Sequence, residues 1–272
     1  MLEKWKTYCG GSTLLAWLTL TEVGVWVIVM ILALTGKFLN FDLELAEWIT
    51  LPYRFSIYIT RPWTLVSYIA IHFEFLHMLF NVLWLYWFGM IMLLTLHDRH
   101  LALSFFGGGI CGGIIFLIAA AFGHGAGWLC GCSASVIAVM TVAAIRLPNH
   151  RINLFLIGEV KLKWVAVACC VLTFLGGGGN QAAHVGGLIW GIGIGILLRK
   201  GIDPTSFGRR LMNSSYNGDR QRNSDKMVKV LQERRNDKAR LDELLDKIKI
   251  SGYESLSRKE RTELNDISKR IK

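Results

Sequence analysis

Long apolar runs dominate the first 198 residues of the chain. A helix that crosses a bilayer needs about 20 mostly apolar residues. One such run covers residues 16–36, with Glu22 near the end that we expect to face the cytoplasm. A second covers residues 75–96, where 22 residues include no Asp, Glu, Lys or Arg. Each run predicts one membrane-spanning helix.

Two longer uncharged stretches follow, and each is long enough for two spans. The stretch 100–145 has 46 residues and is interrupted by the glycine-rich segment 123–127. The stretch 164–198 has 35 residues and is interrupted by the glycine-rich segment 176–180. Because clustered glycines favour turns, the pattern predicts an all-α, polytopic membrane domain with six transmembrane helices over residues 1–200.

The remaining segments differ sharply from these runs. Residues 37–74 form a long loop rich in aromatic rings, which suit the membrane–water boundary, so we expect the loop to lie partly in the interface. After the last span, residues 201–224 are predicted to be a basic linker and residues 225–272 a cytoplasmic helical hairpin. Its first helix, about 225–250, is amphipathic, and Ser257 with Glu260 forms a capping box for a helix over about 258–271.

Composition and charge narrow the class of protein. Hydrophobic residues make up 53% and charged residues 18%, against roughly 25% charged in soluble domains. Residues 1–198 carry 18 charged side chains, whereas residues 199–272 carry 20 basic and 12 acidic ones. This division excludes a single water-soluble domain, a disordered chain and an outer-membrane barrel, whose signal is weak alternation. No metal or cofactor is expected, because the six cysteines show no metal-ligand spacing.

The distribution of positive charge predicts the orientation. With the N-terminus inside, the inner segments carry more Lys and Arg than the outer loops, which favours both termini in the cytoplasm. A basic tail directly after a span is expected to face anionic lipid. Nucleic acid is not an expected partner, because the tail mixes acidic with basic residues and has no basic and aromatic patch.

Polar side chains inside predicted spans are costly and often functional. His77 and Asn81 are four residues apart, so they share one face of the second span; the alternative is that they only join neighbouring helices. Ser133 opens the fourth span, where free backbone N–H groups favour a developing anion. Its alternative role is a simple N-cap.

Small residues predict which helices meet. Gly187, Gly191 and Gly195 recur every four residues in the last span, and Ala134 and Ala138 give the fourth span a matching small face. If these faces pack together, Ser133 and His184 come to lie at similar depth. A lone histidine near the end of a span, as His184 is, is usually a packed or interfacial residue.

The segments His77-Met-Leu-Phe-Asn81, Gly131-Cys-Ser133-Ala and Ala183-His184-Val-Gly-Gly resemble, in order, the three signature motifs of the rhomboid intramembrane serine proteases. The similarity covers roughly residues 15–200 and departs from the family pattern at Ala134 and Ile137. It implies a rhomboid-like six-helix bundle in the bacterial cytoplasmic (inner) membrane, with transmembrane proteins as substrates cut near the outer face.

The resemblance also implies roles for individual residues. Ser133 would be the nucleophile and His184 its general base, with His77 and Asn81 stabilising the oxyanion. Gly131 would permit the loop geometry, Gly187 and Gly191 the helix packing, and Phe80 and Trp164 are candidates for a lateral gate. The alternatives are a non-catalytic rhomboid-like protein that binds membrane helices, and a transporter or channel, for which internal repeats are lacking. The sequence does not predict the oligomeric state.

Overall fold

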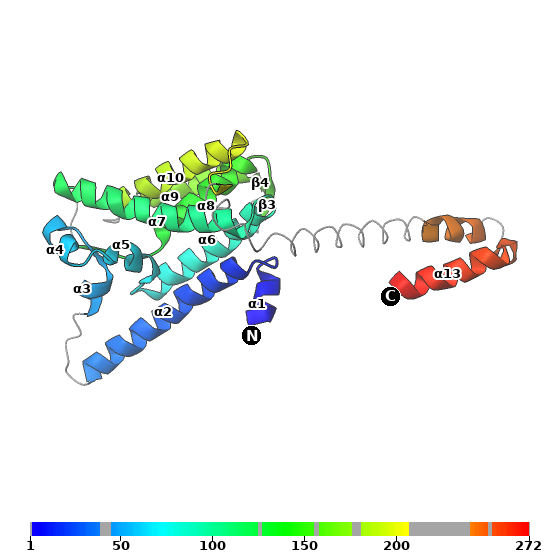
Figure 1. Cartoon of the computed structure of the whole chain (residues 1–272), viewed down its shortest axis with the longest axis horizontal. Helices are drawn as coiled ribbons and strands as arrows, with labels where there is room; N and C mark the ends of the chain where they lie inside the picture. The colour runs from blue at the N-terminus through cyan, green and yellow to red at the C-terminus, as the bar shows by residue number, and fades with distance from the viewer. Residues whose placement is uncertain are drawn as a thin grey trace. The chain divides into compact units, whose positions relative to one another are not determined.

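The computed structural model describes residues 2–38, 45–124, 127–154, 158–175, 181–206, 240–249 and 252–271. The chain divides into two compact units, Met1–Thr205 and Ser206–Lys272. The first unit is a bundle of helices that lie side by side (Figure 1). Six apolar helices build it: α2 (Thr13–Phe38), α6 (Phe75–Leu93), α7 (Asp98–Ala121), α8 (Ser133–Arg146), α9 (Leu162–Leu175) and α10 (Gln181–Arg199).

Within the described ranges, four of these helices, α2, α6, α7 and α10, are long and apolar enough to cross a membrane. Helices α8 and α9 have 14 residues each, so each is about 21 Å long at 1.5 Å per residue. The hydrocarbon core of a bilayer is about 30 Å thick. The predicted count of six spans therefore stays a prediction, although a helix occupies each of the six positions.

The two predicted breaks have different outcomes. Helix α7 ends at Ala121 and α8 begins at Ser133, so the break predicted at residues 123–127 is confirmed. The break predicted at residues 176–180 lies outside the described residues.

Helix α8 lies inside the bundle, with its residues 134–143 all buried. A glycine face on α7 allows this close packing. A Cβ atom added at Gly112 would lie 2.6 Å from the Cβ of Ala134, and one added at Gly108 would collide with the Cβ of Ala138. Because protein rather than lipid surrounds α8, its length need not match the thickness of the bilayer.

The prediction of an all-α domain is wrong in one detail, because two small antiparallel sheets are present. Strand β1 (Leu51–Pro52) pairs with β2 (Trp128–Leu129), and β3 (Arg151–Leu154) pairs with β4 (Gly158–Lys161). The β1–β2 pair joins the first loop to the segment that precedes α8. Strands this short carry no readable alternation of polar and apolar residues.

The aromatic segment after α2 is compact. It contains α3 (Leu45–Ile49), α4 (Phe55–Thr60), α5 (Thr64–Ser67) and the 3-10 turn η1 (Tyr68–Ala70), and a further helix, α1 (Leu2–Tyr8), precedes α2. The indole rings of Trp48 and Trp63 stack with centroids 6.1 Å apart, and the Arg61 guanidinium lies 4.0 Å from the Trp48 ring centroid. Its place at a membrane interface stays a prediction.

Hydrogen bonds and ion pairs of Asp203 connect the residues after α10 to the start of α7. Its carboxylate accepts hydrogen bonds from Arg99 at 3.0 Å and from Thr205 at 2.6 Å, and lies 3.2 Å from His100. Burial acts to raise the pKa of Asp203, but hydrogen bonds from Thr205 and the neighbouring His100 and Arg99 outweigh it and lower the pKa to about 2. The carboxylate therefore stays ionised, and the contact intact, at neutral pH.

The second unit contains the predicted last helix, α13 (Arg258–Ile271), and the short turn η2 (Tyr253–Ser255). The predicted capping box is present, because Glu260 accepts from the Ser257 amide at 2.8 Å and Ser257 Oγ from the Glu260 amide at 3.3 Å. Residues 240–249 are helical, whereas the first part of the predicted helix over 225–250 lies outside the described residues. Leu244, Leu256 and Ile267 are buried in this unit.

Candidate active site

Ser133 is the first residue of α8 and follows a turn that requires glycine. Gly131 has a φ of 101°, in the left-handed region that residues with a Cβ rarely adopt. A Cβ at this position would also lie 2.8 Å from Cε1 of His77. The Gly131 amide donates to the carbonyl of Tyr68 at 2.9 Å. These constraints hold the turn, which places Ser133 where the first N–H groups of the helix are free of intrahelical partners.

His184 lies in the first turn of α10, and its Nε2 is 2.8 Å from the Oγ of Ser133. The two helices approach closely through the small faces predicted to meet. A Cβ added at Gly187 would collide with the Ala134 carbonyl oxygen, and one added at Gly191 would lie 2.9 Å from the Ala138 carbonyl oxygen. The structure therefore brings together Ser133 and His184, which are 51 residues apart in the chain.

The hydrogen bond can prepare Ser133 for attack in one tautomer of His184. If Nε2 is unprotonated, it accepts the hydroxyl proton, and the neutral ring then carries its own proton on Nδ1. Nδ1 is buried and has no hydrogen-bond partner among the described residues. A buried donor without an acceptor costs about 1–3 kcal/mol. The ring is thus oriented by its bond to Ser133 and by packing, an arrangement that a nucleophile and its base require.

His77 and Asn81 lie one turn apart on α6 and border the turn that carries Ser133. The His77 ring lies against Gly131. The Asn81 side chain is buried, and its Nδ2 is 3.1 Å from the Nε2 of His72. Amide and imidazole N–H groups at this place have the chemistry needed to bind a developing oxyanion.

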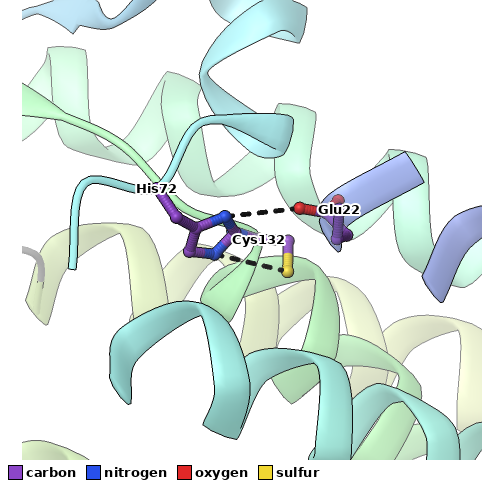
Figure 2. A group of neighbouring side chains, drawn as sticks. All are labelled: Glu22, His72 and Cys132. Carbon is purple, nitrogen blue, oxygen red and sulfur yellow. Dashed lines mark hydrogen bonds and ion pairs between the residues drawn. The ribbon is translucent and has the colours of Figure 1, made fainter. Parts of the chain in front are cut away.

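Three residues that the sequence analysis did not assign to the site lie behind it, and Figure 2 shows how their side chains converge. Glu22 of α2 is 2% exposed, and His72, from the segment between η1 and α6, and Cys132 are fully buried. The Glu22 Oε2 is 3.4 Å from His72 Nδ1, and the Cys132 amide donates to His72 Nε2 at 3.4 Å. Glu22 is therefore not simply a charge near the cytoplasmic end of a span.

A lone acid in an apolar helix was the one signal in the sequence for this cluster. Helix periodicity could not reveal His72, because it lies outside α6.

The same three residues are the group, among those the structure describes, that brings metal-ligand atoms within 4.8 Å of one another. However, the Glu22 carboxylate lies against Nδ1 of His72, whereas the Cys132 thiol lies 3.9 Å from Nε2. One imidazole binds one metal ion through one nitrogen, so this arrangement fits two separate polar contacts on opposite sides of the His72 ring better than a shared ion.

The two candidate gate residues lie on different helices at the surface of the bundle. Phe80 on α6 is 50% exposed and Trp164 on α9 is 59% exposed. Their role as a gate stays a prediction.

The chain is similar to known proteins over the region that contains these residues. A family model for the rhomboid domain matches residues 60–201, just over half of the chain, and one for a family of unknown function (DUF6576) matches residues 228–270. Rhomboid protease GlpG from Yersinia pseudotuberculosis serotype I (strain IP32953) is 28% identical over 185 residues. The alignment covers 64% of this chain and 60% of that relative's length. Together with the apolar helices, these matches indicate a multi-pass membrane protein. The chain belongs to the rhomboid family.

Proposed function

We propose that the protein is an intramembrane serine endopeptidase that cleaves transmembrane segments of other membrane proteins with a dyad of Ser133 and His184. The observation that carries this proposal is the 2.8 Å contact between Ser133 Oγ and His184 Nε2. It lies at the start of two apolar helices within the rhomboid domain. A serine and a histidine in hydrogen-bond contact are the minimum required for acyl transfer through a covalent intermediate.

The chemistry follows the usual course of serine proteases. His184 Nε2 takes the hydroxyl proton as Ser133 Oγ bonds to the carbonyl carbon of the substrate, and the carbonyl oxygen becomes an oxyanion. His184 then gives the proton to the leaving amine as the C–N bond breaks, which leaves an acyl ester on Ser133. A water molecule, deprotonated by His184, hydrolyses the ester and restores the Ser133 hydroxyl.

His77, Asn81 and the backbone N–H of Ser133 are the proposed donors to the oxyanion. The free amides of the first turn of α8 add the positive end of the helix dipole. Loss of one oxyanion donor typically costs about 2.7–4 kcal/mol of transition-state stabilisation.

The substrate must reach this site from the lipid and expose its peptide bond. A helix hides its carbonyls in internal hydrogen bonds, so the substrate segment has to unwind locally near the outer membrane face. We assign Phe80 and Trp164 to the gate that admits it. The proposal also includes six spans, in which protein segments extend beyond the ends of the short helices α8 and α9. Both termini lie in the cytoplasm. The membrane is the bacterial inner membrane, and the basic tail lies beside anionic lipid.

Ser133→Ala tests the proposal most simply. We expect the wild-type protein, reconstituted in vesicles, to cleave a co-reconstituted model transmembrane substrate, and Ser133→Ala to show no cleavage above background. Ser135→Ala is the matched control, because Ser135 is on the same helix, buried, and its Oγ has no hydrogen-bond partner among the described residues. It should cleave at the wild-type rate. Gel separation and mass spectrometry of the products give the measurement.

Cleavage that persists in Ser133→Ala would refute the assignment of the nucleophile. A wild-type protein that binds the substrate helix without cutting it would instead support the non-catalytic alternative.

A further inference from the structure

Glu22 is a buried acidic residue that lies beside the candidate active site, although its helix precedes the part of the chain that matches the rhomboid domain. It belongs to α2, which precedes the matched residues 60–201. Its side chain is 3% exposed and faces two groups at the turn that precedes Ser133. The His72 ring lies on one side, and the Cys132 Sγ lies within 4.8 Å of the carboxylate. A buried carboxylate in an apolar helix requires such donors.

The contacts of His72 determine where its proton lies. Its Nε2 receives the backbone N–H of Cys132 at 3.4 Å, and a backbone amide can only donate. Nε2 also lies 3.1 Å from Asn81 Nδ2, which is likewise a donor. Nε2 must therefore be the unprotonated acceptor, so a neutral His72 carries its proton on Nδ1. That proton faces Glu22 Oε2 at 3.4 Å, an ion-pair contact rather than a hydrogen bond, and neither atom has a hydrogen-bond partner among the described residues.

We infer that Glu22 is a positioning residue: its carboxylate holds the Nδ1–H tautomer of His72, whose Nε2 in turn fixes the Asn81 amide and the backbone N–H of Cys132, next to Ser133. This inference rests on the proposed function, because Asn81 acts there as an oxyanion-binding group and the turn before Ser133 positions the nucleophile. Glu22 itself does not touch the reacting atoms. Without the carboxylate, the Nε2–H tautomer becomes accessible and would point a proton at two donors, which would displace them.

The test replaces the acceptor while keeping the length of the side chain. Glu22→Met should lower kcat for a transmembrane substrate about 10–100-fold, as the loss of a group that orients a metal-bound histidine does, with KM unchanged. Glu22→Gln keeps an acceptor oxygen for Nδ1–H and should stay within about threefold of wild type by the same reasoning. Thr21→Val, at an exposed neighbouring position of α2, is the control for loss of polarity in this helix.

A second readout does not depend on proteolysis. In ¹⁵N NMR of the wild-type protein at neutral pH, His72 should show a protonated Nδ1 and an unprotonated Nε2. Glu22→Met should show a mixture of tautomers or the opposite one, and Glu22→Gln should keep the wild-type pattern.

The two readouts separate this inference from the proposed function. If wild type cleaves and kcat of Glu22→Met is unchanged, the inference is overturned and the proposed function stands. If the tautomer shifts as expected but wild type cleaves no substrate, the proposed function fails while the control of His72 by Glu22 holds. Three further results would overturn the inference about Glu22. The first is an equal loss of kcat in Glu22→Met and Glu22→Gln, and the second is a loss of kcat in Glu22→Met that a lower thermal midpoint explains. The third is one zinc ion per chain that the wild-type protein retains and Glu22→Met loses.

Discussion

His184→Ala is expected to lower kcat for a transmembrane substrate by about 10²–10⁴-fold, the contribution of a positioned general base. The imidazole Nε2 is the group placed to accept the Ser133 proton, at 2.8 Å. A serine hydroxyl without a base is a weak nucleophile at neutral pH. The rate of product formation at saturating substrate, in vesicles, measures the effect.

His150→Ala is the control for the loss of one imidazole. His150 lies just before β3, and among the described residues its backbone is hydrogen-bonded to Leu147 and Leu162. This variant should keep the wild-type rate. If His184→Ala stays within threefold of wild type, another group acts as the base and the dyad assignment is wrong.

Gly187→Ala is expected to reduce activity by at least about 100-fold, the effect of displacing reacting groups by about 1 Å. The added Cβ would collide with the Ala134 carbonyl oxygen and lie 2.8 Å from its carbonyl carbon. Those atoms belong to the backbone of α8, so α8 and α10 must separate just where Ser133 meets His184. Overpacking of this kind also destabilises by about 1–3 kcal/mol. Cleavage rate and thermal midpoint in detergent micelles are measured together.

Gly193→Ala is the matched control for this prediction. It makes the same substitution six positions along α10, where an added Cβ would have no heavy atom within 4 Å. Both variants gain the same helix propensity, worth about 1 kcal/mol, so their difference isolates the contact between the helices. Equal activity in the two variants would show that the close approach at Gly187 is not required.

The sequence predicted the helices, and the similar depth of Ser133 and His184, because both depend on simple patterns; the pairing of the two residues came from the family resemblance. Uncharged runs of about 20 residues are typical of membrane-spanning helices. The glycines of α10 and the alanines of α8 indicate that these two helices pack closely. This packing sets the relative depth of the Ser133 and His184 side chains. Once these faces pack as the structure has them, Ser133 and His184 have little freedom to lie apart.

The parts that the sequence did not predict depend on contacts between distant segments. His72 follows η1 in an extended segment, where helical spacing carries no information. The direction in which Glu22 points is set by how α2 docks, and the β1–β2 pairing joins segments almost 80 residues apart. The glycines of α7 are visible in the sequence, but their contact with α8 follows from three-dimensional packing alone.

A fluorophosphonate probe tests the central claim most directly, because it bonds to a serine oxygen only when that oxygen is made nucleophilic. The reacted protein is digested, and mass spectrometry locates the phosphonyl group. The proposed dyad predicts an adduct on Ser133 in the wild-type protein and little or none in His184→Ala under the same conditions. An adduct on another residue, or equal labelling of Ser133 in both proteins, would contradict it.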